Sequence, residues 1–157
     1  MNQEYVKTKE NDGLKKLREW NTRYGCFDNI TQTKMGTSDD AICTRNGKEY
    51  YVEYKDRNYK SLKEFSKHFR TVFIEPYKFA FLLSLQVLGK STYYINFFGK
   101  DVVIFNMKKM AEQMADRRLG TYKGDVKDHG LGAEVEVQRL CLPLTAATVY
   151  EYDSQSS

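Results

Sequence analysis

Few of the residues that build disulfide frameworks and zinc sites occur in this chain. Its 157 residues include three cysteines and two histidines. Cys26, Cys43 and Cys141 are odd in number and widely spaced, and no Cys-x-x-Cys motif occurs. A structural zinc site needs four Cys or His ligands at characteristic spacings. The sequence therefore argues against both kinds of site and predicts reduced cysteines in the core.

Long hydrophobic runs are also missing. The longest apolar run, around residues 79–88, is shorter than the roughly 20 residues that a membrane-spanning helix requires. The segment Met1–Lys7 has none of the apolar stretch that characterises a secretory signal peptide. We therefore expect an intracellular, cytoplasmic protein with no membrane contact.

The motifs of two common enzyme classes are absent as well. There is no glycine-rich phosphate-binding loop, and no nucleophile elbow accompanies His68 and His129. The net charge of +4 is too small for an arginine-rich nucleic-acid binder. A chain of this length without internal repeats is expected to form a single domain, residues 1–157, with a polar tail at 153–157.

The chain does contain two carboxylates and a lysine at a meaningful spacing. Asp40 opens one strand-like segment, and Glu53 and Lys55 lie near the end of the next, which is rich in aromatic and β-branched residues. Asn46-Gly47 between them is a strong hairpin signal. Side chains alternate along a strand, so Glu53 and Lys55 share one face, roughly 6.5–7 Å apart. Pairing across the turn then brings Asp40 near Glu53.

Two carboxylates beside a lysine suit metal-dependent hydrolysis of a phosphodiester. Mg²⁺ is usually bound by one or two carboxylates together with water and substrate phosphate. The cation lowers the pKa of a bound water and offsets charge on the phosphate. Lys55 could orient the attacking water or stabilise developing negative charge. We therefore expect Asp40, Glu53 and the main-chain carbonyl of Tyr54 to bind Mg²⁺ or Mn²⁺.

The order of these motifs carries a family resemblance. Asp-Ala-Ile from residue 40, a hairpin, Val-Glu-Tyr-Lys from residue 52 and a helix-rich stretch together resemble the PD-(D/E)XK nuclease superfamily. In that family an Asp and the Glu of Glu-x-Lys bind metal and the lysine assists the chemistry. The resemblance gives these roles to Asp40, Glu53 and Lys55, while Asp39 competes with Asp40 and replaces the Pro of the family name. It implies a restriction-endonuclease-like α/β fold, in which a central mixed β-sheet is flanked by helices around an αβββαβ core.

The resemblance extends over roughly residues 8–110 and adds two site residues. Many members carry a glutamate on the first helix, for which Glu10 is the candidate here and Glu19 the next. Similar nucleases often place a basic or amide residue near the start of the helix that follows the Glu-x-Lys strand, which is the position of Lys78. Pro76 and Gly89 mark the expected start and stop of that apolar helix.

The remaining pattern predicts further elements. We expect helices over about 4–24 and from 107 to near 118, strands over 91–98 and 101–107, a polar connection over 26–37, a mobile loop or flap over 120–133, and an edge strand or strand end at Pro143.

A basic stretch follows the Glu-x-Lys segment and is interleaved with aromatic residues. Its cations include Arg57, Lys60, Lys63, Lys67 and Arg70. This composition suits a phosphate backbone, and it equally fits a solvated amphipathic helix that buries Phe65 and Phe69. The two interpretations are compatible.

The sequence thus predicts a Mg²⁺- or Mn²⁺-dependent nuclease, with DNA the expected substrate by resemblance. The alternative is a catalytically inactive nucleic-acid-binding or protein-interaction module on the same fold. A homodimer would supply the two sites that cutting both strands requires. The small size fits a nuclease of a phage or mobile element, or an enzyme of DNA repair, recombination or junction processing.

Overall fold

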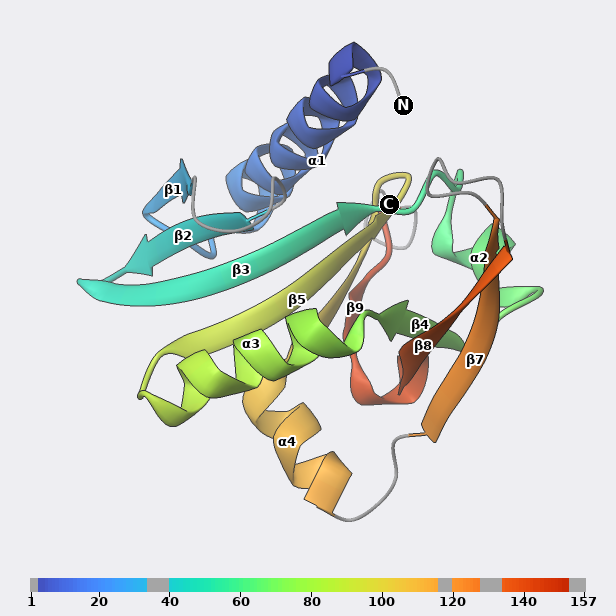
Figure 1. Cartoon of the computed structure of the whole chain (residues 1–157). Coiled ribbons are helices and arrows are strands. Elements are labelled where there is room, and N and C mark those ends of the chain that lie inside the picture. The colour runs from blue at the N-terminus through green and yellow to red at the C-terminus, as the bar shows by residue number, and fades with distance from the viewer. Residues whose placement is uncertain (1–2, 34–39, 116–119, 128–133, 153–157) are drawn as a thin grey trace.

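A six-stranded mixed sheet lies at the centre of the chain, with helices on both faces, as the computed structural model in Figure 1 shows. The structure describes residues 3–33, 40–115, 120–127 and 134–152, and for residues 3–11 and 113–139 it describes at most the backbone. The central sheet has the order β1-β2-β3-β5-β6-β9. Its strands are β1 (Asn29–Gln32), β2 (Asp40–Arg45), β3 (Lys48–Asp56), β5 (Ser91–Phe98), β6 (Asp101–Asn106) and β9 (Thr148–Tyr150).

Four helices and a second, smaller sheet complete the described part of the chain. The helices are α1 (Gln3–Tyr24), α2 (Leu62–Ser66), α3 (Pro76–Val87) and α4 (Met107–Ala115), and a 3₁₀ turn spans Leu144–Ala146. The small sheet has the order β4-β8-β7, formed by β4 (Thr71–Ile74), β8 (Glu134–Pro143) and β7 (Gly120–Lys127). No helix in the described ranges is long and apolar enough to cross a membrane.

The hairpin between β2 and β3 fixes the register on which the site depends. Asn46 and Gly47 both have positive φ, 52° and 77°, which suits the tight two-residue turns of β-hairpins. The antiparallel pairing that follows sets Asp40 opposite Glu53. β3 then pairs in parallel with β5 through the crossover that contains α3, whereas the other neighbours in this sheet are antiparallel.

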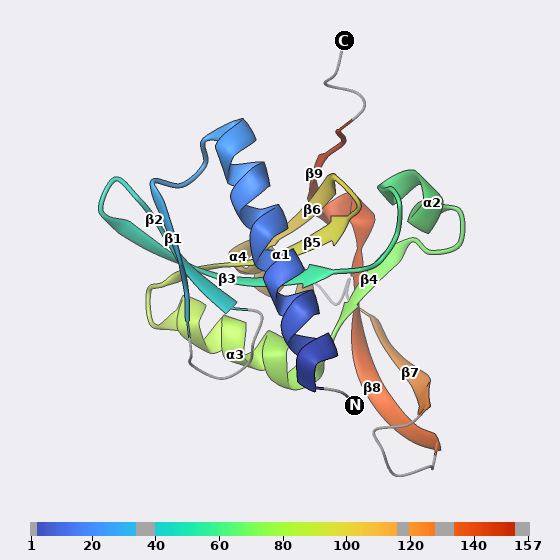
Figure 2. The ribbon, with the colours of Figure 1, turned by 90° about the horizontal axis from the view of Figure 1, so that it is seen from above.

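Alternation along β3 divides its side chains between two cores. Val52 and Tyr54 pack under α1, where Leu17 and Trp20 are buried. Tyr51 belongs to the opposite core, which α3 and α4 cover. Figure 2 shows α1 running across the strands on its own face of the sheet. The two faces therefore carry separate layers, and Glu53 lies on the α3 face, where β3 places Tyr51.

Gly13 allows α1 to lie close to the sheet. A Cβ atom at this position would approach the Tyr54 ring to 3.0 Å, which is tighter than ordinary van der Waals contact. The side chain of Tyr54 is fully buried. A glycine inside a helix costs about 1 kcal/mol relative to alanine, so the close approach gives a physical reason for its presence here.

Several predicted elements are confirmed and others are wrong. The helix predicted over about 4–24, the start of the helix predicted from 107, and the strand pair at 91–106 lie where the pattern placed them. The predicted end of the second helix near 118 lies outside the described residues. The polar connection over 26–37 contains strand β1, and residues 120–127 form strand β7 instead of a loop. The rest of the predicted loop, residues 128–133, lies outside the described residues. Pro143 is the last residue of β8, so the predicted strand end is confirmed, although β8 is the central strand of the small sheet and not an edge strand. Phe65 is buried as predicted, but Phe69 is 44% exposed.

The turn between β5 and β6 provides a test of the fold. Gly99 has a φ of 62°, and a Cβ there would collide with the main-chain carbonyl of Lys60. Gly99→Ala is therefore expected to lower the free energy of unfolding by more than about 2 kcal/mol, because the backbone strain at positive φ and the steric collision with Lys60 both destabilise the folded state. Gly47→Ala is the control, since its φ is also positive but no atom lies within 4 Å of its Cβ position. It should lose only about 1 kcal/mol in urea unfolding; equal losses would mean that the contact with Lys60 is unimportant.

Candidate metal and catalytic site

Two buried carboxylates meet where β2 begins. Asp40 and Glu53 are directly opposite each other across the hairpin and are only 2% and 3% exposed. A side-chain hydrogen bond joins the two carboxyl groups, and the Tyr51 hydroxyl donates to Asp40 Oδ2 at 2.7 Å. Two carboxyl groups can hydrogen-bond to each other only when one of them carries a proton. The predicted neighbourhood of Asp40 and Glu53 is thus confirmed.

The environment strongly favours the protonated form of Glu53. Burial and the hydrogen bond to Asp40 raise the pKa of Glu53 to about 9, although the ammonium group of Lys78 acts in the opposite direction. Burial and the same acidic neighbours raise the pKa of Tyr51 as well, so its hydroxyl stays a donor. The site consequently keeps a proton where a cation would otherwise balance charge.

Lys78 reaches this pair from α3. Its Nζ lies 2.9 Å from Glu53 Oε1, and its side chain is only 10% exposed. Burial alone would lower the pKa of Lys78, but the carboxylate of Glu53 raises it overall. Pro76 occupies the start of α3, where a missing N–H costs nothing, and this start places Lys78 in the first turn. The predicted approach of Lys78 to the site is therefore observed.

Lys55 is paired with a residue that the sequence analysis did not identify. Its Nζ lies 3.1 Å from Glu75 Oε1, and their side chains are 21% and 32% exposed. Burial lowers the pKa of Lys55, partly offset by Glu75. Burial opposes ionisation of Glu75, yet Lys55 and Lys78 lower its pKa overall. Glu75 stands at the N-cap of α3 and makes no side-chain capping bond. An acidic residue directly before Pro76 and three positions before Lys78 was the available signal.

Arg57 forms hydrogen bonds inside the protein, whether or not it also binds nucleic acid. Its guanidinium donates to Asn96 Oδ1, to the carbonyl oxygen of Phe73 and to the Tyr94 hydroxyl, and so ties the central sheet to β4. Burial raises the pKa of Tyr94 to about 12. Arg57 was predicted to bind nucleic acid, and these bonds direct its donors into the protein.

The other predicted nucleic-acid-binding residues lie at the surface. Lys60, Lys63, Lys67 and Arg70 are all exposed, on or beside α2. They form a group of cations beyond the carboxyl end of β3, where Figure 1 places α2. Their exposure leaves them accessible to a phosphate backbone.

Two further predicted site residues are Glu10 and Tyr54. Glu10 is part of helix α1, but the structure does not describe its side chain, so its role in the site stays a prediction. The side chain of Tyr54 packs in the core under α1, on the face opposite Glu53. Only the main-chain carbonyl of Tyr54 is therefore suited to the ligand role assigned to it.

The donor set fits a hard divalent cation. Among the described side chains, no group of three or more His, Cys, Asp or Glu residues gathers around one point. The two paired carboxylates nevertheless match the one or two that Mg²⁺ commonly takes, with waters and phosphate completing its shell. The close pairing of the two buried carboxyl groups supports this fit, because a cation could relieve the repulsion between Asp40 and Glu53 as a proton does.

Comparison with known proteins gives no independent assignment. No family model, curated protein or solved structure matches this chain. We therefore infer the function from the arrangement of the residues in this chain.

Proposed function

We propose that this protein is a metal-dependent nuclease similar to the PD-(D/E)XK superfamily, which hydrolyses phosphodiester bonds in DNA. The observation that carries the proposal is the pair of buried carboxylates, Asp40 and Glu53, opposite each other and joined by a hydrogen bond, with Lys55 two residues further along β3. The element order supports it: with α2 and β4 inserted between β3 and α3, the order α1-β1-β2-β3-α3-β5, with β5 parallel to β3, follows the αβββαβ order that the resemblance implies.

Asp40 and Glu53 would hold Mg²⁺ or Mn²⁺, with the main-chain carbonyl of Tyr54 as a further oxygen ligand. When bound, such a cation supplies a more acidic water and charge stabilisation at the phosphate. Lys78 would remain as a second positive charge beside Glu53, at the 2.9 Å separation observed. It would balance the carboxylate in the absence of substrate and approach the phosphate in its presence.

Lys55 is the residue proposed to act on the attacking water or on the developing charge. Its lowered pKa makes proton exchange at Nζ easier than for a solvated lysine. Glu75 holds that Nζ at 3.1 Å and so restricts its orientation. A preorganised cation next to a phosphate contributes most when water is largely excluded, and Lys55 is partly buried.

The substrate would extend from the site towards α2. Lys60, Lys63, Lys67 and Arg70 are exposed cations suited to backbone phosphates. Each phosphate contact made by such a cation adds to the salt dependence of binding. Two copies of the protein would place two sites on a duplex, which is the basis for proposing a homodimer on double-stranded substrates.

The test is cleavage of labelled DNA with Mg²⁺, Mn²⁺ or EDTA, using single-stranded, duplex, flap and junction substrates. Cleavage should require the cation and fall at least about a hundredfold in Glu53→Gln and in Lys55→Ala. Lys90→Ala is a matched control, because Lys90 is an exposed lysine just beyond α3. It should retain the activity of the unsubstituted protein.

Each alternative result has a clear meaning. Cleavage that survives both substitutions would reject this site as the source of activity. Salt-sensitive DNA binding by a folded protein that cuts none of the substrates would favour the inactive binding module. The absence of both cleavage and binding would reject a nucleic-acid function.

A further inference from the structure

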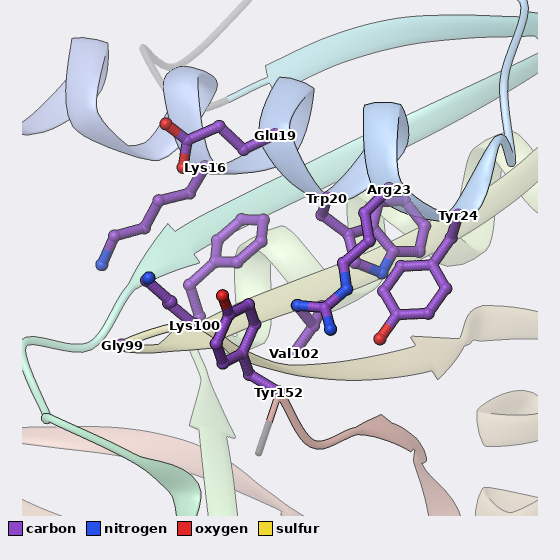
Figure 3. Close-up of a pocket in the computed structure, with 10 residues that line it drawn as sticks. Lys16, Glu19, Trp20, Arg23, Tyr24, Gly99, Lys100, Val102 and Tyr152 are labelled. Carbon is purple, nitrogen blue, oxygen red and sulfur yellow. The ribbon is translucent and has the colours of Figure 1, made fainter. Parts of the chain in front are cut away.

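A pocket of about 380 Å³ lies on the other face of the central sheet, between α1 and the turn that joins β5 to β6. Figure 3 shows side chains from these elements and from Tyr152 surrounding it. Its volume is within the range of about 300–1,000 Å³ that is typical of small-molecule sites. Phe97 and Val102, which line it, belong to the core under α1, whereas Tyr51 of the α3 core lies on the other side of β3.

The base of this pocket is apolar and largely aromatic. Trp20, Phe97 and Val102 are 6%, 1% and 2% exposed, and the ring of Tyr152 adds a half-buried aromatic surface. The indole Nε1 of Trp20 is buried and has no hydrogen-bond partner among the described residues. A buried donor without an acceptor costs about 1–3 kcal/mol, which a ligand acceptor could offset after a small side-chain movement.

The rim carries positive charge next to the aromatic surface. The Arg23 guanidinium lies 4.1 Å from the centroid of the Tyr152 ring, and Lys100 Nζ lies 4.5 Å from it. Lys16 also lines the pocket, but Asp56 pairs with it at 3.0 Å. Glu19 is the acidic residue of the lining, so its three cations, with Glu19 and the Asp56 partner of Lys16, leave a local charge of +1. Arg23 and Lys100 are the cations best placed for an anion, because neither forms an ion pair with a described residue, whereas Lys16 does.

We propose that this pocket binds a nucleotide, with the base on the aromatic surface and the phosphate at Arg23 and Lys100. Nucleobases stack on aromatic side chains and on guanidinium planes, while basic side chains hold the phosphates. The pocket offers both kinds of contact within one volume. The nucleotide can be free or an unstacked residue of a single strand, because the two present the same base and phosphate.

This proposal does not rest on the nuclease assignment. The pocket lies on the α1 face, whereas Glu53 and Lys78 lie on the α3 face. Glu53→Gln is therefore expected to leave nucleotide binding unchanged. A nucleotide-binding assay and a DNA-cleavage assay therefore test the pocket and the nuclease site separately.

The pocket contains its own reporter, because Trp20 is the single tryptophan of the chain. Thymidine 5′-monophosphate should change its fluorescence saturably, and thymidine and inorganic phosphate should each bind at least about tenfold more weakly. Calorimetric titration run in parallel would detect binding that leaves the fluorescence unaltered. A single-stranded oligothymidylate should compete with the mononucleotide, and its relative affinity distinguishes a free nucleotide from a strand.

A double variant tests the two cations directly. Arg23→Gln with Lys100→Gln should weaken mononucleotide binding at least about tenfold, and both residues are exposed, so the fold should be retained. Arg18→Gln with Lys90→Gln is the charge-matched control outside this pocket. Three results would overturn the proposal: no binding in either assay at millimolar nucleotide, equal binding of inorganic phosphate and nucleotide, or binding that the double variant leaves intact.

Discussion

Replacing Glu53 with glutamine is expected to flatten the dependence of the free energy of unfolding on pH between pH 5 and 8 in metal-free buffer. Glu53 has an ordinary pKa near 4.5 when unfolded and a pKa of about 9 in the folded protein. Within that interval the folded state binds a proton that the unfolded state has released. The unsubstituted protein should therefore lose up to about 1.4 kcal/mol of stability per pH unit as the pH rises.

The sign of this effect follows from which form is favoured by folding. A raised carboxyl pKa stabilises the folded state fully below pH 4.5, and that stabilisation is lost as the pH rises towards 9. The pKa of Glu75 is lowered, so its contribution is lost below pH 4.5. The pKa of Lys78 is raised above 10.5, so its contribution is lost only at higher pH. Neither of these residues produces the slope expected between pH 5 and 8.

Glu49→Gln provides the matched control for this measurement. Glu49 is on the same strand as Glu53 but is exposed, so the pH profile of this variant should follow that of the unsubstituted protein. Urea unfolding at several pH values, with EDTA present, measures the profiles. Mg²⁺ at a hundred times its dissociation constant should then add about 2.7 kcal/mol to the unsubstituted protein and little to Glu53→Gln. Equal slopes in both proteins would contradict the protonated state assigned to Glu53.

The pairing of Asp40 with Glu53 could be predicted because it is set by local geometry. Asn46-Gly47 specifies a two-residue turn, and alternation along the hairpin then determines which residues face each other. The same logic placed Lys55 on the face of Glu53. Short-range turn chemistry thus supplied the centre of the candidate site without knowledge of the whole fold.

The partners of the two lysines depend on longer-range packing. Glu75 and Lys55 are twenty positions apart in sequence and meet only because α3 lies against the sheet. The bonds of Arg57 to Asn96 and Tyr94 similarly require the parallel crossover to β5. Periodicity identifies an amphipathic or buried helix, but it does not specify where that helix lies on a sheet.

The pocket under α1 was beyond sequence reasoning for the same reason. Arg23, Lys100 and Tyr152 come from three distant parts of the chain and converge around one ring. The small sheet was missed because β4 pairs with β8, which lies some seventy residues later in the sequence. Each of these features is a contact between distant elements, and the sequence pattern of each element alone does not indicate its partner.

Lys78→Met is expected to lower the free energy of unfolding by about 3–5 kcal/mol at pH 10, where Glu53 is ionised in the folded protein, because it removes the cation from a buried ion pair. Methionine retains most of the apolar stem, so loss of charge dominates the change. The loss should be smaller at pH 5, where Glu53 is protonated in the folded protein. Thermal unfolding at the two pH values measures the difference, at about 2–4 °C per kcal/mol for a chain of this size.

Two comparisons separate charge from packing at Lys78. Glu53→Gln combined with Lys78→Met should recover much of the stability, because no unpaired charge then remains in the site. Lys55→Met should cost less than about 1 kcal/mol, since Glu75 is 32% exposed and can be solvated. If Asp40 and Glu53 form a cation site, Mg²⁺ should stabilise Lys78→Met more than the unsubstituted protein at pH 8. A loss that is the same at both pH values, unaffected by Glu53→Gln and insensitive to Mg²⁺ would assign Lys78 a purely packing role and remove the electrostatic basis for the metal site.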